Sequence, residues 1–392
     1  MKILHTSDWH IGRTFHGHST LAHLRVVLDS LVAAVREREI DVVAVAGDVF
    51  DSSMPSAESF AVLSSALRDI RDAGAQVVMT SGNHDSATRL GFQSEWATLS
   101  GIHIVTRPDQ YLEPVIVDDE YGPVAFYGIP YLEPAIFRHH HPGSELRTHE
   151  QVLDFAMQAI RADVAARDTR SVVLSHCFVS NVAASGSDPA TEATDVERDI
   201  TSGGLNLVPV PVFDGPDYVA LGHIHGRSML SDRVRYSGAP LHYSFGEAGK
   251  PRGGWLVELD AGGLDTVEWV DLPVPRRLTV LTGELDDLVG SEEYAGFEND
   301  WVDAILTDRV RPMDAMRRLQ DRFPYCAHLD YRPAVTAERS AETYRQRVEK
   351  KTDDQIVAGF LELVRNGVGP SDVEAALIRD VVAEQAAKEA AL

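Results

Sequence analysis

One short stretch, Asp41–Asp51, limits most strongly what this chain can fold into. Its apolar run from Val42 to Ala46 is five residues long, which is too short for a helix and typical of a strand buried on both faces. The run ends in Gly47, where the backbone can turn, and Asp48 follows at once. Because open α/β sheets bind ligands at the carboxyl ends of their strands, this is a position where a functional carboxylate is expected. A lone Gly-Asp pair is more often a simple turn, so its meaning depends on the other strand ends.

Four further apolar runs also end in residue types that bind metals. The first run of the chain leads into Asp8 and His10, which we expect on the same side of an extended backbone because they are two residues apart. The other three runs lead into Asn83-His84-Asp85, into His176 and into His223-Ile224-His225. A single histidine after a strand is usually structural. Five such endings in one parallel-sheet pattern are hard to reach by chance, and together they predict a metal site.

The residue types indicate which chemistry such a site would support. Aspartate, asparagine and histidine offer oxygen and imidazole ligands, which suit Mn²⁺, iron or Zn²⁺ better than a thiolate site would. Two such ions, roughly 3.5–4 Å apart, share a bridging carboxylate and hold the oxygens of an in-line displacement at phosphorus. Asp48 is the expected bridge because it belongs to the central strand. His84 follows the expected ligand Asn83, so its ring can face the substrate, donate a proton to the leaving oxygen or stabilise charge on the phosphate.

In order and spacing, the chain resembles the calcineurin-like metallophosphoesterases. Their full motif set is matched by Asp8-x-His10, Gly47-Asp48-x-x-Asp51, Gly82-Asn83-His84-Asp85, His176 and Gly222-His223-x-His225. The sequences in and between these motifs, such as Ser7–Gly17 and Arg235–Leu241, resemble the SbcD branch, the bacterial relatives of a double-strand-break-repair nuclease. The match covers essentially the whole chain, strongly to about Asp260. It departs at Gly226-Arg227-Ser228, where the branch usually carries Pro-Gln.

The resemblance implies a fold and a set of site residues. The fold is α/β, a metallophosphoesterase sandwich of two central sheets flanked by helices, with a small α+β capping domain and C-terminal helices. Two divalent ions are implied, with Mn²⁺ preferred. The first lies on Asp8, His10, Asp48 and His225, and the second on Asp48, Asn83, His176 and His223. The catalytic proton-donor or transition-state role falls to His84, and the Asp51 carboxylate is expected to orient it.

Three domains are expected along the chain. A nuclease domain over 1–270 is followed by a proline-rich linker, a capping domain over 276–336 and a docking element over 350–392. Capping boxes at Thr352-x-x-Gln355 and Ser371-x-x-Glu374 open two helices in this last part. The resemblance implies that this helix-loop-helix binds the coiled coil of an SbcC-like ATPase. An ordinary C-terminal bundle packed on its own protein is the alternative.

Periodicity predicts the remaining elements. Helices are expected over 19–38, 56–73 and 148–167, a strand over 124–129, a long irregular loop over 180–204, and an exposed loop over Arg138–Pro142. In relatives, helices near 56–73 pair two nuclease subunits, although core packing explains the same apolar stripe. Cys177, next to His176, is expected to be a small buried residue and no ligand.

Composition restricts the partners and the location. A formal net charge of −24 argues against a free-standing DNA binder, because duplex affinity depends on Lys and Arg. We therefore expect weak DNA affinity for the chain alone, with further DNA contacts made by the ATPase. Two cysteines, no membrane-length apolar run and no signal sequence indicate a cytoplasmic protein with no membrane partner.

The activity follows from the resemblance. It implies an SbcD-like subunit of an SbcCD-type DNA repair nuclease that acts in DNA recombination, replication and repair. Such a complex is an ATP-stimulated 3′→5′ exonuclease on double-stranded ends and an endonuclease on single strands and hairpins, with a homodimer of the nuclease subunit inside a heterotetramer. Two alternatives remain: a metallophosphatase acting on phosphomonoesters or phosphoproteins, and a non-catalytic scaffold for DNA or the ATPase.

Overall fold

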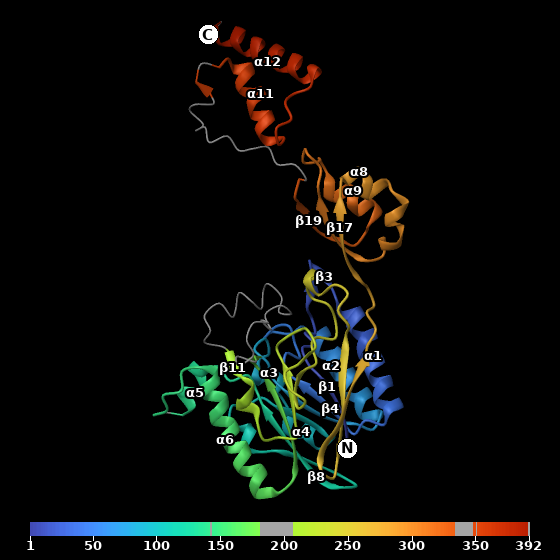
Figure 1. Ribbon diagram of the computed structural model, residues 1–392, viewed down its shortest axis with the longest axis vertical. Coiled ribbons are helices and arrows are strands. Elements are labelled where there is room, and N and C mark those ends of the chain that lie inside the picture. The colour runs from blue at the N-terminus through green and yellow to red at the C-terminus, as the bar shows by residue number, and fades with distance from the viewer. Residues whose placement is uncertain (142, 181–206, 334–347, 350, 391–392) are drawn as a thin grey trace. The chain divides into compact units, whose positions relative to one another are not determined.

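A computed structural model of the protein describes residues 1–141, 143–180, 207–333, 348–349 and 351–390. It divides into two compact units, Met1–Arg277 and Leu278–Leu392 (Figure 1). The loop expected over 180–204 falls, apart from Ser180, outside the described residues. Among the described helices, none is long and apolar enough to cross a bilayer.

The first unit contains a six-stranded sheet in the order β16-β15-β1-β4-β5-β6. Its parallel part consists of β1 (Lys2–Thr6), β4 (Val42–Ala46), β5 (Gln76–Thr80) and β6 (Ile102–Val105). On the other side of β1, the hairpin of β15 (Gly253–Asp260) and β16 (Gly263–Asp271) adds two antiparallel strands. Strand β4, which precedes Asp48, is therefore internal to the sheet.

A second six-stranded sheet has the order β13-β14-β12-β9-β8-β7. Its parallel core is formed by β8 (Gly122–Ile129), β9 (Arg170–His176), β12 (Tyr218–Gly222) and β14 (Val234–Tyr236). The antiparallel edges are β7 (Val115–Asp119) and β13 (Ser228–Met229). Short additional strands are β2 (Thr14–Phe15), β3 (His18–Ser19), β10 (Phe178–Ser180) and β11 (Leu207–Pro209).

The two sheets pack face to face, and helices cover their outer faces. Val42 and Ala44 point into the apolar cluster between the sheets, whereas Val43 and Val45 point into the cluster under α1 (Leu21–Arg38) and α2 (Ala57–Asp72). This alternation is the period of two of a strand, and it explains why the run is apolar at every position. Helix α6 (His149–Arg167) covers the second sheet. The expected two-sheet sandwich flanked by helices is confirmed.

The helix ends follow local chemistry. Ser56 caps α2 by accepting a hydrogen bond from the backbone of Ser59 at 3.1 Å, and Thr148 and Gln151 form a capping box at the start of α6. The loop predicted over Arg138–Pro142 is wrong at residues 138–140, which belong to α5 (Pro134–His140), while Pro142 lies outside the described residues. Pro134 sits in its first turn, where the missing N–H costs nothing. The remaining short helices are α3 (Ala87–Leu90), α4 (Ser94–Thr98), η1 (Gln110–Leu112), η3 (Val210–Phe213) and η4 (Phe245–Glu247).

The second unit begins with a three-stranded parallel sheet, β17 (Leu278–Gly283), β18 (Trp301–Leu306) and β19 (Cys326–Tyr331), in that order. It packs with α8 (Leu285–Gly290), η5 (Glu292–Phe297) and α9 (Ala315–Arg322) around a separate apolar cluster. Two helices follow, α11 (Asp353–Val364) and α12 (Asp372–Ala390). A bidentate ion pair of Arg365 with Glu374, at 2.8 and 3.0 Å, connects the end of α11 to the first turn of α12.

Candidate metal centre

The polar strand ends converge on one site, but they come from two sheets. Strands β1, β4 and β5 of the first sheet supply Asp8, His10, Asp48 and Asn83, and strands β9 and β12 of the second supply His176, His223 and His225. Strand β4 contacts both β9 and β12. The single parallel-sheet pattern expected from the sequence is therefore corrected: the carboxyl ends of two facing sheets meet, and the site lies where they meet.

The backbone at the site is turned rather than extended. Strand β1 ends at Thr6, and Asp8 and His10 have φ values of 53° and 43°, so the extended geometry expected for this pair is wrong. Asp48 has a φ of 48° as well. The Asp8 N–H donates to the carbonyl of Gly47 at 3.1 Å, and the His10 N–H donates to that of Asp48 at 3.0 Å. These paired turns hold uncommon conformations for non-glycine residues, which cluster at functional sites.

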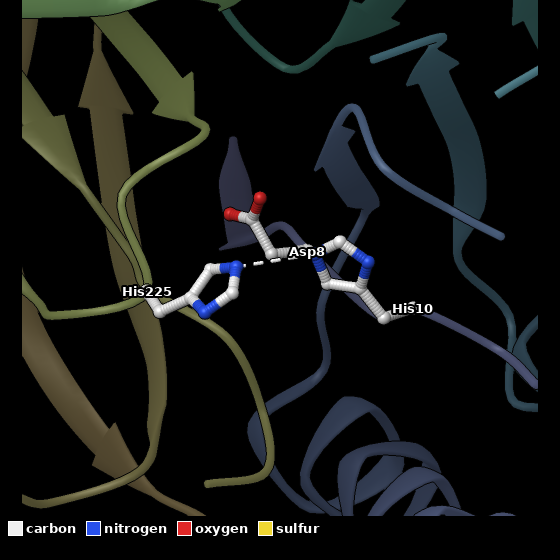
Figure 2. A group of neighbouring side chains, drawn as sticks. All are labelled: Asp8, His10 and His225. Atoms are coloured by element: carbon white, nitrogen blue, oxygen red, sulfur yellow. Dashed lines mark hydrogen bonds between the residues drawn. The ribbon is translucent and has the colours of Figure 1, made fainter. Parts of the chain in front are cut away.

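The first group of side chains consists of Asp8, His10 and His225 (Figure 2). The Nε2 atoms of His10 and His225 face each other at 3.1 Å. The Asp8 carboxylate accepts hydrogen bonds from the backbone of His223 at 3.1 and 3.2 Å and from the Ser7 hydroxyl at 2.5 Å. These contacts fix the direction of the carboxylate before any ligand binds.

The second group surrounds Asn83. Its Oδ1 atom lies 3.0 Å from Nε2 of His176 and 3.1 Å from Nδ1 of His223. Asp48 stands between the two groups, because its Oδ2 atom lies 3.4 Å from Nε2 of His176 and 3.6 Å from Nε2 of His10. A single carboxylate in contact with both groups has the position that a bridging ligand needs.

The electrostatics of the site favour a cation. Burial raises the pKa of Asp8 to about 6, while burial lowers the pKa of His10 to about 4 and that of His223 to about 3. Burial alone would raise the pKa of Asp48, but the charge and hydrogen bond of His176, together with the charges of His10 and His84, outweigh it and hold that pKa far below its usual range. At neutral pH the site thus presents ionised carboxylates and the neutral imidazoles of His10 and His223, whereas nearby carboxylates keep His176 protonated, and a cation bound at His176 would replace that proton.

His84 and Asp51 touch in a different way from the one expected. The backbone N–H of His84 donates to Oδ1 of Asp48 at 2.9 Å, and its Nδ1 lies 2.9 Å from the carbonyl oxygen of Asp51. Because a carbonyl only accepts, Nδ1 carries the proton and Nε2 is left for the site. The Asp51 carboxylate contacts instead His10, at 3.3 Å from Nδ1, and Arg13, at 3.2 Å. The main chain of Asp51, rather than its carboxylate, therefore orients His84.

Asp85 has a role that its residue type alone did not indicate. Its carboxylate accepts backbone hydrogen bonds from Val49 at 3.0 Å, Phe50 at 2.8 Å and Gly82 at 2.9 Å. It thereby ties the turn after β4 to the turn after β5, the two segments that carry Asp48 and Asn83. The signal in the sequence was its place directly after Asn83-His84.

The donor set fits hard or borderline divalent ions. It consists of carboxylate, amide and imidazole atoms, in which Mn²⁺, iron and Zn²⁺ find suitable ligands. Cys177, adjacent to His176, belongs to none of the candidate ligand groups among the described residues, and burial raises the pKa of its thiol to about 12. A thiolate site is thus disfavoured.

Two family models match this chain. The one described as calcineurin-like phosphoesterase matches residues 1–227, and SbcD_C, described as the type 5 capsule protein repressor C-terminal domain, matches residues 274–365. Among solved structures, TT1561 of Thermus thermophilus is similar at 15% identity, covering 69% of this chain and 98% of that one, with a TM-score of 0.38. A dimetal phosphatase from Danio rerio is similar at 14% identity, with the same coverages and TM-score.

Proposed function

Because this chain belongs to the calcineurin-like phosphoesterase family, and is thus a metal-dependent hydrolase, we propose that it is the nuclease subunit of an SbcCD-type complex. Its substrate is DNA, whose phosphodiesters it hydrolyses in recombination, replication and repair. With an SbcC-like ATPase it acts as an ATP-stimulated 3′→5′ exonuclease on duplex ends and as an endonuclease on single strands and hairpins. The match of SbcD_C to residues 274–365 supports this choice within the family.

One observation carries the proposal: seven side chains of metal-binding type converge from five strand ends, with Asp48 in contact with both groups. The proposed ligands of one ion are Asp8, His10, Asp48 and His225. Those of the other are Asp48, Asn83, His176 and His223. When bound, two Mn²⁺ ions would supply positive charge and Lewis acidity at the scissile phosphate.

The protein's own contribution to the reaction comes from His84. Its Nδ1–H is held by the Asp51 carbonyl, so its Nε2 faces the site with a fixed direction. We assign His84 to proton donation toward the leaving sugar oxygen, for which the ring must carry a second proton on Nε2, or to stabilising charge on the phosphate. Asp51 acts as a positioning residue, through its carbonyl on His84 and its carboxylate on His10.

The net charge of the chain limits its affinity for DNA. With a formal net charge of −24, it cannot build long-range attraction for a polyanion. Affinity for DNA therefore comes from the metal centre and from the ATPase partner, and the isolated chain binds duplex weakly at physiological salt. The two free cysteines, Cys177 and Cys326, suit a cytoplasmic location.

The two terminal helices support a protein partner. Helices α11 and α12 contain no buried residue in their described parts, although they carry large apolar side chains. Those exposed are Val357, Phe360, Leu363, Val364, Val373, Leu377 and Val381. Amphipathic helices normally bury such side chains, so an unpaired face of this kind indicates a docking surface, here for the coiled coil of the ATPase.

A second apolar surface supports pairing of the nuclease subunit. Phe92, Trp96 and Leu99 are all more than 70% exposed and lie four and three residues apart, around α4. Phe60, on the stripe of α2 expected to pair subunits, is also exposed, whereas Leu63, Leu67 and Ile70 are buried in the core. We propose that the Phe92–Leu99 segment belongs to the homodimer interface within the heterotetramer.

One assay separates the proposed activity from its rivals. Labelled duplex, hairpin and single-stranded DNA, a phosphoprotein and a phosphomonoester are each incubated with the purified chain and either Mn²⁺ or chelator. We expect Mn²⁺-dependent cleavage of single strands and hairpins by the chain alone. Hydrolysis of the phosphomonoester or phosphoprotein without DNA cleavage would make it a phosphatase. Absence of all hydrolysis, also with the ATPase present, would leave a scaffold.

A further inference from the structure

A buried ion pair lies behind His225, on the side of the ring away from the other site residues. Glu247, at the end of η4, and Arg252, just before β15, are only 1% and 2% exposed, and the Arg252 guanidinium donates to Oε2 of Glu247. Charged residues are rarely buried to this extent, because removing a charge from water is energetically costly. Apolar side chains would fill the same volume without that cost, so the pair calls for another explanation.

The second oxygen of Glu247 is aimed at His225. Its Oε1 atom lies 3.5 Å from Nδ1 of His225, and no hydrogen-bond partner for this oxygen is found within the described part of the chain. The other oxygen, Oε2, is already used by the backbone N–H of Tyr243, at 3.1 Å, and by Arg252. A fully buried carboxylate oxygen thus faces one ring nitrogen of a candidate ligand.

Arg252 holds the same histidine by its main chain. Besides binding Glu247, its guanidinium donates to the carbonyl oxygen of His225 and, at 3.4 Å, to that of Ala239. The Ala239 N–H donates to the His225 carbonyl as well, at 3.1 Å. Both the backbone and the ring of His225 are therefore held by this pair, whereas its Nε2 atom faces His10.

The position of the Glu247 carboxylate decides which ring nitrogen of His225 carries the proton. A neutral histidine carries one ring proton, and a ring that binds a metal through Nε2 must carry that proton on Nδ1. An acceptor behind Nδ1 fixes this tautomer and orients the ring. His176 has such an acceptor in the carbonyl of Ala46, at 2.9 Å. For His225, the acceptor that faces Nδ1 is the carboxylate of Glu247.

We propose that Glu247 and Arg252 are positioning residues of the metal centre: Glu247 accepts the Nδ1 proton of His225 and Arg252 holds Glu247 in place, so that Nε2 can bind the cation. This inference rests on the proposed function, because it needs a metal bound by His225. It explains the buried ion pair and predicts that only the ion bound by His225 depends on it.

The test is a titration of the full chain with Mn²⁺, in which electron paramagnetic resonance measures the free ion. Wild type should bind two ions. The variant Glu247→Gln keeps the shape and one acceptor, but its amide oxygen can serve only Arg252 or His225. We expect a 10- to 100-fold rise in Kd for one ion and less than a twofold change for the other. Asp119→Asn is the matched control, because Asp119 pairs with buried Arg170 outside the candidate site, and both ions should bind normally.

A measurement on the unchanged chain covers the case in which Glu247→Gln does not fold. In the Zn²⁺-loaded chain labelled with ¹⁵N-histidine, NMR should find His225 protonated at Nδ1 and unprotonated at Nε2. A proton on Nε2, or a Glu247→Gln variant that binds both Mn²⁺ ions with wild-type Kd values, overturns the role of Glu247 and leaves the proposed function intact. Wild type that binds no Mn²⁺ overturns the proposed function itself.

Discussion

Gly82 lies directly against Asp48, so closely that a side chain has no place between them. A Cβ atom at Gly82 would lie 2.1 Å from Oδ1 of Asp48 and 2.4 Å from its backbone nitrogen. The glycine that precedes Asn83-His84 therefore allows the turn after β5 to approach the turn after β4. Both groups of the candidate metal centre depend on that approach, because Asp48 contacts both.

Replacing Gly82 tests this dependence. Gly82→Ala should displace the Asp48 carboxylate, since the neighbouring backbone leaves no alternative position for the methyl group. We expect a loss of at least 100-fold in Mn²⁺-dependent cleavage and weaker binding of both ions in the same titration. Gly290→Ala, where nothing lies within 4 Å of the added Cβ, serves as the control. Normal metal binding by Gly82→Ala would show that the two turns separate easily.

His84 can be removed without removing a proposed ligand. His84→Gln should reduce cleavage of single-stranded DNA by about 10²–10⁴-fold, the usual contribution of a general acid or base. The stoichiometry of Mn²⁺ should stay at two ions per chain. His103→Gln, which replaces a half-buried histidine bonded to Gln76, should leave cleavage unchanged. Cleavage near the wild-type rate in His84→Gln would exclude this histidine from the reaction.

The ion pair of His176 and Asp48 predicts how stability depends on pH when a chelator is present. Burial lowers the pKa of His176, but the charge and hydrogen bond of Asp48, together with the charge of Asp8 and the carbonyl of Ala46, outweigh burial and raise the pKa to about 9. An unfolded histidine has a pKa near 6.5. Because the folded pKa is the higher one, the contribution of the pair is complete below pH 6.5 and is lost as the pH rises through 9.

Urea unfolding in EDTA at pH 6.5 and pH 9.5 measures this effect. We expect the free energy of unfolding to fall by on the order of 2 kcal/mol between these values. The low pKa values of His10 and His223 change stability only below pH 6.5, so they do not mask it. The buried thiol of Cys177, whose pKa is raised to about 12, also lowers stability above about pH 8.5, so the variant His176→Gln should keep that smaller fall and lose the rest. An equally steep fall in the variant would contradict the assignment.

If the exposed apolar face of α11 and α12 is the docking surface, charged substitutions on it should abolish partner binding without affecting the fold or the cleavage activity. The double variant Phe360→Glu/Leu377→Glu places charges where the apolar face would meet the ATPase. We expect co-purification with the ATPase to disappear, while the melting temperature and the Mn²⁺-dependent cleavage of single strands stay unchanged, because both side chains are exposed. Gln385→Glu adds charge to α12 without removing an apolar group and should still co-purify. Retained co-purification of the double variant would exclude this surface.

Trp96 provides a test of subunit pairing. Its side chain is 72% exposed, so Trp96→Glu should leave the fold intact while it removes an apolar contact from the proposed interface. Light scattering after size exclusion should find a dimer for wild type and a monomer for the variant. Met313→Glu, at an even more exposed apolar residue of the second unit, should remain dimeric. A monomeric wild type at micromolar concentration would refute pairing of the isolated chain.

The sequence predicted best what short-range rules control. The runs at Val42 and Tyr218 are strands because their length and apolar composition leave few alternatives, and Thr148 starts a helix because it forms a capping box with Gln151. The convergence of metal-binding residue types at strand ends could also be expected. Which sheet each strand joins could not, because register and neighbours depend on contacts across the whole chain.

Contacts made by the main chain, or between residues far apart in the chain, could not be predicted from the sequence. Asp51 was expected to orient His84 by its carboxylate, but a carbonyl, which every residue has, makes the contact. The turn conformations of Asp8 and His10 depend on bonds to Gly47 and Asp48, and no local pattern indicates them. The role of Glu247 could not be predicted either, because only the folded chain brings it next to His225.

Strand β1, which leads into Asp8, pairs on one side with β4 and on the other with β15, where Lys2 lies opposite Glu258. All seven proposed ligands precede Glu258 in the chain. On the ribosome, they emerge before the sheet that holds the first of them can be completed. The candidate metal centre can therefore take its complete geometry only after β15 has been translated and has paired with β1.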